Sequence, residues 1–234
     1  MLTMKAQYSL RNAESYFREH LGIGDYYMEG RSVSGQWFGE GAKELELSGV
    51  TTEKDFLNLC RNIHPQTEKQ LTPRMNTKRN TVDKNGNVHE SANRRVFYDF
   101  TLSPPKSVSI AALVGNDKRI IEAHDEAVTV ALRELQAYAA TRVRKQNQRS
   151  HRVTGNVVGA VFRHDTSRAL DPHLHSHCIL FNATRLRGEI LGQRKSTLAR
   201  SSCCGIVKGK NSKRFAVQIK LGFLEPQHKP QHKP

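Results

Sequence analysis

One long helical period, bracketed by strand-like segments, constrains the fold of this chain more than any other feature. The period runs from about residue 118 to about residue 143, and its inward positions recur at helical spacing: Ile120, Ala123, His124, Ala127, Ala131, Leu135 and Tyr138. Residues 96–102 precede it and residues 157–162 and 174–181 follow it, and all three segments are typical of strands. Because strands bracket one helix without βαβ alternation, we predict an α+β fold with a central antiparallel sheet and flanking helices.

The second strand after the helix carries alternating histidines. His173, His175 and His177 are two residues apart, so on a strand their imidazoles share one face. His164 ends the preceding strand and can meet them across the connection. Three imidazole ligands leave coordination positions open, as a catalytic metal site requires. We therefore predict one divalent metal ion on a β-hairpin, the alternative being a polar strand face that binds no metal.

The four histidines exceed the three ligands that such a site needs, and their spacing does not say which one is spare. Neutral imidazole suits Zn, Ni, Co or Mn, whereas Mg usually prefers oxygen ligands. The residues alone do not distinguish Mg, Mn, Zn and Ni.

Tyrosines gather near the amino end, where Tyr8, Tyr16, Tyr26 and Tyr27 lie within the first 27 residues. A phenol with a pKa of about 10 is a poor nucleophile unless a neighbouring group accepts its proton. Once activated, it can attack phosphorus and form a covalent ester that keeps the energy of the phosphodiester. The alternative for Tyr16 is packing on an amphipathic helix. Tyr26 and Tyr27 sit in a glycine-flanked segment and are harder to assign to a core.

A carboxylate interrupts the first strand-like segment, residues 96–102. Asp99 shares one strand face with Phe97 and Thr101. It is suited to orient a histidine ligand through the second ring nitrogen, or to accept a tyrosine proton. The alternative is a surface carboxylate on an edge strand, and the sequence alone leaves these choices open.

The charge of the chain is strongly basic but uneven. The formal net charge is +15 and the isoelectric point is near 9.9, which favours a polyanionic partner such as nucleic acid. Residues 187–234 hold eleven of the 37 Lys and Arg residues but only two of the 22 acidic ones. This basic tail has no long amphipathic period, so we predict that it is poorly ordered. It is either a DNA-binding arm or a frameshifted end whose basicity is accidental.

Several protein classes are excluded or disfavoured by missing patterns. No run of about 18 apolar residues occurs, which excludes a membrane-spanning helix. The amino end has no apolar segment typical of a secretion signal, so we expect a protein that is not secreted. No phosphate-binding loop of the Gly-Lys-Ser/Thr type is present, which excludes a DNA motor. The four cysteines lack Cys-x-x-Cys spacing, which disfavours a disulfide framework and a four-cysteine zinc site.

Six segments occur together in a specific order between residues 1 and 186. They are Ala-Glu-Ser-Tyr-Phe at 13–17, Asp-Tyr-Tyr at 25–27, the glycine-rich stretch at 35–42, the strand and turn at 98–109, Thr-Gly-Asn at 154–156, and the histidine segment at 164–177. With these segments the chain resembles the relaxase domain of conjugative plasmid transfer proteins, the MobF type within the three-histidine HUH endonucleases. The resemblance implies a central antiparallel sheet with helices packed on it.

The resemblance also implies roles for individual residues. The metal ligands would be His164, His175 and His177, which leaves His173 outside the set. The first nucleophile would be Tyr16, at a place where the family often has a Tyr-Tyr pair and this chain has Tyr-Phe.

Further roles follow from the same resemblance. The second active tyrosine would be Tyr26, and the catalytic carboxylate would be Asp99. Lys106 and Arg168 lie in matching motifs and are expected to contact DNA phosphate, and Trp37 is a candidate for stacking on a base.

The implied function is site- and strand-specific DNA nicking and strand transfer at a plasmid transfer origin. The product would be a 5′-phosphotyrosine and a free 3′-hydroxyl. The expected partners are single-stranded DNA at that origin and other conjugation or relaxosome proteins, in the bacterial cytoplasm. Alternatives are a remnant that binds origin DNA without cutting it, and a rolling-circle replication initiator.

The resemblance stops near residue 186. We therefore expect a relaxase domain at residues 1–186, possible incompleteness of that domain, and a divergent tail at residues 187–234.

Overall fold

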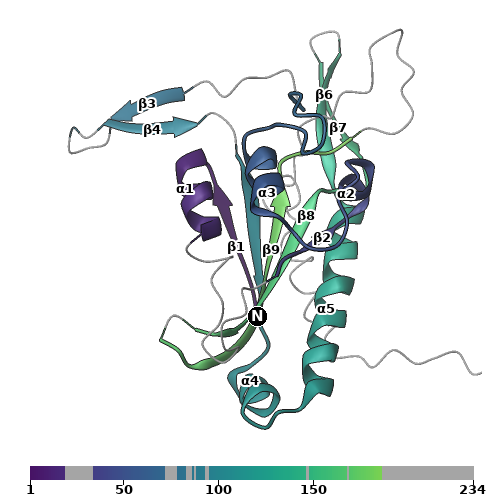
Figure 1. The fold of residues 1–234 in the computed structure, drawn as a ribbon. Helices are drawn as coiled ribbons and strands as arrows, with labels where there is room; N and C mark the ends of the chain where they lie inside the picture. Colours follow the sequence, from purple (N-terminus) through teal and green to yellow (C-terminus); the bar gives the residue numbers. More distant parts are fainter. Residues whose placement is uncertain are drawn as a thin grey trace, which may run out of the picture.

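The computed structural model describes residues 1–18, 34–71, 78–82, 86, 88–92, 95–145, 148–167 and 169–185. A five-stranded sheet organises this part of the chain, with strand order β1-β5-β9-β8-β2 (Figure 1). The strands are β1 (Leu2–Gln7), β2 (Gln36–Phe38), β5 (Phe97–Leu102), β8 (Gly159–Thr166) and β9 (Pro172–Phe181). Each neighbouring pair is antiparallel, which confirms the predicted α+β class.

Helices cover both faces of this sheet (Figure 1). On one face lie α1 (Leu10–Tyr16), α2 (Glu40–Glu44) and α3 (Glu53–Cys60), whose apolar side chains share a core with Phe97, Phe162 and Phe181. On the other lie α4 (Lys106–Leu113) and α5 (Lys118–Ala137), and α5 packs on Tyr98, Phe100 and Leu180. Side chains of β5 thus alternate between the two cores, as the period of a strand requires.

Side-chain caps set the start of three helices. The N-cap Ser9 accepts a hydrogen bond from the Asn12 backbone N–H before α1, and Thr52 accepts one from Asp55 before α3. Asp117 accepts from the Arg119 N–H before α5. Because helix starts depend on local hydrogen bonds, they are accessible from sequence.

The end of α5 differs from the expectation. The helix stops at Ala137, and residues 140–143, which were predicted to extend it, belong instead to β6 (Ala140–Lys145), which pairs with β7 (Gln148–Val153). The Thr154 N–H donates to the Ala139 carbonyl at 2.7 Å and closes this hairpin at its base. The apolar period had already ended at Tyr138, and the pairing with β7 satisfies backbone groups that a longer helix would have used.

A second small hairpin joins β3 (Lys78–Val82) and β4 (Val88–Ala92), which pair antiparallel. The segment between them contains Asn-Gly at residues 85–86, a pair typical of hairpin turns. Gly86 between them has φ +82°, a conformation that glycine adopts without steric cost.

An aromatic cluster holds α1 and α3 on the sheet. Phe56 of α3 contacts Phe17 at 4.6 Å between ring centroids and Phe181 of β9 at 5.1 Å. The rings of Phe17 and Phe56 are tilted by 39° and those of Phe56 and Phe181 meet edge-to-face at 68°, and aromatic pairs at these distances stabilise a core beyond the area they bury. Since Phe17 directly follows Tyr16, the cluster fixes the carboxyl end of α1 over the centre of the sheet.

His124 of α5 makes the fold sensitive to acid. Its side chain is buried, and Nε2 lies 2.9 Å from Ser176 Oγ. Burial lowers the pKa of His124, so below about pH 6.5 the unfolded chain binds more protons there than the folded chain, and stability falls as pH falls.

We expect the wild-type urea midpoint to fall more steeply between pH 7.5 and 5.5 than that of His124→Gln, which cannot titrate. Equal slopes for the two proteins would contradict this origin of acid sensitivity.

Candidate active site

Tyr16 ends α1 above the sheet, and its hydroxyl reaches Asp99 of β5. Oη donates to Asp99 Oδ2 at 2.5 Å and lies 3.4 Å from His177 Nδ1. The Tyr16 ring centroid is 6.0 Å from that of Phe97, so the aromatic cluster supports it from below. The phenol, the carboxylate and the imidazole therefore form one contiguous group, although 161 residues separate Tyr16 from His177.

Asp99 lies at the centre of this group and not at the surface. β5 runs between β1 and β9, and Asp99 is 4% exposed, so the alternative of a surface carboxylate on an edge strand is wrong. His177 Nδ1 lies 3.1 and 3.0 Å from the two Asp99 oxygens. Asp99 thus bonds both the tyrosine and the histidine, and the two roles left open by the sequence are compatible.

Three histidine rings surround one point on the same sheet face. His164 of β8 is the direct partner of His175 of β9. Ring centroids are 5.3 Å apart for His164 and His175, 5.5 Å for His164 and His177, and 5.1 Å for His175 and His177. Three imidazoles bound to one tetrahedral ion at about 2.1 Å would place their ring centres about 5 Å apart. The rings therefore already have the spacing of a metal site.

Hydrogen bonds to the outer nitrogens fit the same chemistry. His177 Nδ1 faces Asp99, and His175 Nδ1 lies 2.8 Å from the His173 carbonyl oxygen. Metal-binding histidines commonly donate the second ring N–H to a carboxylate or carbonyl in this way, which leaves the other nitrogen for the ion. Burial lowers the pKa of His175 to about 4, so this imidazole is neutral at neutral pH, as a ligand must be.

The histidine group is not a complete metal site as the side chains stand. No three His, Cys, Asp or Glu residues within the described ranges form a set that could hold an ion. The ring spacing and the donor chemistry nevertheless fit a divalent ion. His173 lies beside the other three histidines, with its ring stacked on that of His175 and the two centroids 4.7 Å apart.

The residues expected to contact DNA are more dispersed. Trp37 lies on β2 and packs against Phe181, with ring centroids 6.3 Å apart. Lys106 begins α4, and its Nζ lies 3.9 Å from Asp171 on the connection before β9. Tyr26 and Arg168 lie outside the described residues, as does the predicted tail at 187–234.

Thr101 is a site residue for which the sequence patterns predicted no role. Its Oγ1 lies 3.3 Å from His177 Nδ1, and it is the direct partner of His177 across β5 and β9. The sequence could have indicated this role, because Thr101 is two residues beyond Asp99 and therefore shares its strand face. Thr101 therefore joins Asp99 and Tyr16 around one imidazole nitrogen.

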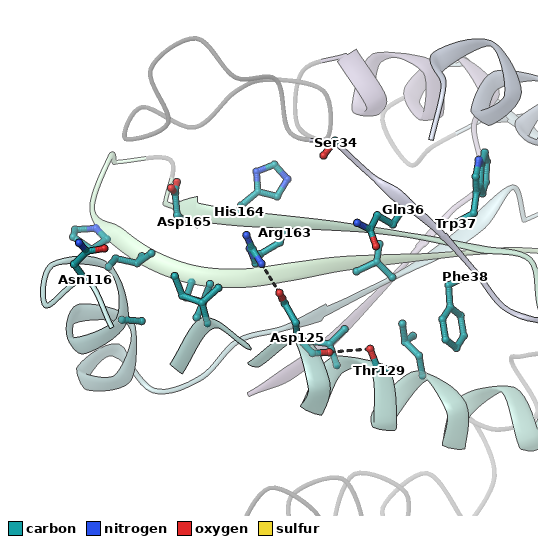
Figure 2. A pocket seen from close by; sticks show the side chains of 18 of the residues that line it. Ser34, Gln36, Trp37, Phe38, Asn116, Asp125, Thr129, Arg163, His164 and Asp165 are labelled. Carbon is teal, nitrogen blue, oxygen red and sulfur yellow. Dashed lines mark hydrogen bonds and ion pairs between the residues drawn. The ribbon is translucent and has the colours of Figure 1, made fainter. Parts of the chain in front are cut away.

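A pocket of about 820 Å³ lies next to this site, between the β2–β8 edge of the sheet and α4–α5 (Figure 2). His164 and Asp165 line it at one border, and Figure 2 shows Arg163 and Asp125 facing each other within it. The pocket thus adjoins the histidine group from the side of the sheet that α5 covers.

A central antiparallel sheet that gathers a helix-borne tyrosine, a carboxylate and three histidines has the arrangement expected of three-histidine HUH relaxases. Residues 10–206 match the model of the TrwC relaxase family. The chain belongs to this family, which confirms the resemblance to MobF-type relaxase domains.

Curated relatives agree with this assignment. The multifunctional conjugation protein TraI of Escherichia coli is 36% identical over 189 residues, which is 81% of this chain and 10% of that protein. The TraI of Escherichia coli strain K12 is 36% identical over 190 residues, with the same shares. The chain thus spans about a tenth of the length of these relatives.

Solved structures show the same fold. Conjugative relaxase TrwC in a metal-bound complex with oriT DNA has a TM-score of 0.71 and 30% identity, over 96% of this chain and 68% of that chain. TrwC in a metal-free complex with oriT DNA has a TM-score of 0.67 and 27% identity, over 100% of this chain and 72% of that chain. Among the described helices, none combines the length and apolarity needed to cross a bilayer.

Proposed function

We propose that this chain nicks one DNA strand at a plasmid transfer origin in conjugation and joins the strand covalently to Tyr16. The observation that carries the proposal is the hydrogen bond from Tyr16 Oη to Asp99, beside His177 and the other two histidine rings. The relatives agree with it, because TrwC has been solved with oriT DNA and with a bound metal.

The proposed reaction is a transesterification at phosphorus. Tyr16 Oη attacks the scissile phosphorus, the bond between phosphorus and the 3′-oxygen breaks, and the products are a 5′-phosphotyrosine and a 3′-hydroxyl. Asp99 accepts the phenol proton through its 2.5 Å hydrogen bond with Tyr16. His177 Nδ1, 3.0 Å from Asp99 Oδ2, holds the carboxylate in position. The ester retains the energy of the phosphodiester, so the reverse reaction reseals a strand.

His164, His175 and His177 would hold one divalent ion. When bound, such an ion would offset the negative charge that builds on the phosphate oxygens during attack. Mg, Mn, Zn and Ni remain the candidates. His173 stays outside the ligand set in this proposal, as the family resemblance implies, and its ring stacks on that of His175 with centroids 4.7 Å apart.

The remaining roles complete the proposal. Tyr26 serves a second strand transfer, and Lys106 and Arg168 bind backbone phosphates of single-stranded or locally melted DNA. Trp37 offers a surface on which a base can stack. Relaxosome proteins are the further partners, in the cytoplasm of a bacterium, with residues 1–186 as the relaxase domain and 187–234 as a separate tail.

End-labelled oligonucleotides test the proposed function. Single strands tiling the transfer origin next to the gene are incubated with the chain and Mn²⁺ and separated on a denaturing gel. A 3′-labelled strand is expected to migrate as a covalent protein adduct, and a 5′-labelled strand as a shortened free product. No adduct, or the adduct on the 5′-labelled strand, would contradict the proposal.

Replacement of Asp99 distinguishes a role in the cleavage step from a role in DNA binding. Asp99→Asn keeps the size of the side chain but removes a proton acceptor, so we expect single-turnover cleavage to slow by about 10²- to 10⁴-fold. Binding of the uncut oligonucleotide, measured by fluorescence anisotropy, should change by less than about threefold. A large loss of binding with little loss of rate would assign Asp99 to structure instead.

A further inference from the structure

The side of β9 that faces away from the histidines carries specific polar anchors. Leu174 and Ser176 alternate with the histidines and point toward α4 and α5, and each is 1% exposed. Ser176 Oγ lies 2.9 Å from His124 Nε2, and both side chains are buried. A buried hydroxyl and a buried imidazole that satisfy each other hold α5 to β9 at one defined position.

The next residue of α5 holds the neighbouring strand. Asp125 forms an ion pair with Arg163 of β8, drawn as a dashed line in Figure 2. Arg163 and Ser176 are direct partners in the antiparallel register of β8 and β9. Two consecutive residues of α5 therefore contact both members of one residue pair of this hairpin, His124 through a buried hydrogen bond and Asp125 through a partly exposed ion pair.

This residue pair lies between the two that carry the histidines. On one side is the pair His164 and His175, and on the other is the pair of Phe162 and His177. Neighbouring residues of a strand share a rigid backbone and point to opposite faces. A displacement of Ser176 relative to Arg163 would therefore move His164 of β8 relative to His175 and His177 of β9.

A third anchor lies where the pairing of the two strands becomes irregular. The register between β8 and β9 shifts between His164 and Thr166. Close to this shift, the Leu174 N–H donates to Ser109 Oγ of α4 at 3.2 Å, and Ser109 is fully buried. The Ser109 hydroxyl of α4 thus holds the backbone N–H of Leu174, the residue just before His175, from the sheet face opposite the histidines.

We propose that His124, Asp125 and Ser109 act as a clamp that sets the spacing of His164, His175 and His177 for a divalent ion. The inference rests on the proposed function of those histidines as metal ligands. None of the three clamp residues belongs to that ligand set, so they are positioning residues that act through the backbone of β8 and β9. The clamp gives a role to the buried polar groups in the otherwise apolar contact of α5 with the sheet.

Calorimetric titration of the full chain with Co²⁺ tests the clamp without any DNA. Ser176→Ala removes only the hydroxyl that His124 holds, and we expect its Co²⁺ affinity to fall by roughly tenfold, a typical effect of residues behind a metal ligand. His124→Leu should have the same effect, whereas His124→Gln, whose amide can reach Ser176, should recover most of the affinity.

Leu135→Val is the matched control, because Leu135 is buried on the same helix and the same sheet face, about three turns from His124. It should lower the melting temperature while Co²⁺ affinity stays within about twofold of wild type.

Each result bears on the clamp. Equal Co²⁺ affinity for wild type and Ser176→Ala, or an equal loss in Leu135→Val, would overturn the clamp while leaving the metal ligands intact. A wild-type chain that binds no Co²⁺ would overturn the ligand assignment and the clamp together. A loss in Ser176→Ala and His124→Leu that His124→Gln restores would support it.

Discussion

Tyr16→Phe is expected to abolish cleavage and the covalent DNA adduct while leaving the fold and DNA binding almost unchanged. The substitution removes a single oxygen, the atom that would attack phosphorus, so the rate should fall by about 10⁴-fold or more. The ring contact with Phe97 does not depend on that oxygen, and Asp99 keeps its contact with His177. Packing should therefore survive, and the melting temperature should shift by only a few degrees.

The measurement uses the labelled oligonucleotides on a denaturing gel, with anisotropy for binding. Tyr8→Phe is the matched control, because Tyr8 is a partly exposed tyrosine that receives a hydrogen bond from Arg95 and does not reach Asp99. It should cleave like wild type. Full activity of Tyr16→Phe would instead move the nucleophile to another tyrosine such as Tyr26. Specific binding without cleavage in wild type as well would favour the remnant that only occupies the origin.

His175→Ala is expected to lose bound metal and, with it, nicking. One of three ligands disappears, so we expect metal affinity to fall by at least about 100-fold and cleavage to become undetectable. His175 Nδ1 lies 2.8 Å from the His173 carbonyl oxygen, a contact within one strand, so the loss of stability should be small.

His173→Ala is the discriminating control for this experiment. The two histidines are neighbours on one strand face and their rings stack, yet only His175 shares ring contacts with both His164 and His177. Metal content after dialysis, measured by mass spectrometry, should stay near wild type in His173→Ala and vanish in His175→Ala. Unchanged metal in His175→Ala, or loss in His173→Ala alone, would contradict the triad.

The local patterns of the chain predicted much of the site. Alternation along β9 correctly put His173, His175 and His177 on one face, and the same rule put Asp99 with Thr101. Such predictions succeed because the direction of a strand side chain depends only on its position in the strand.

Long-range pairing was beyond the sequence patterns. The helical period did not show that residues 140–145 leave α5 and pair with β7, because a strand needs a partner that lies elsewhere in the chain. The burial of Asp99 likewise depended on β1 and β9 lying on either side of β5. Neither the β6–β7 pairing nor the burial of Asp99 can be predicted from the spacing of nearby residues.

The sequence by itself therefore determined which side chains share a face, and with the family resemblance it proposed the candidate residues of the site. Only the tertiary structure decided that Tyr16 reaches Asp99, that His164 stands opposite His175 while His173 stacks outside, and that α5 grips the hairpin from behind. The physical reason is that side-chain direction follows from local backbone geometry, whereas contacts between distant segments follow from strand register and from the packing of helices on the sheet.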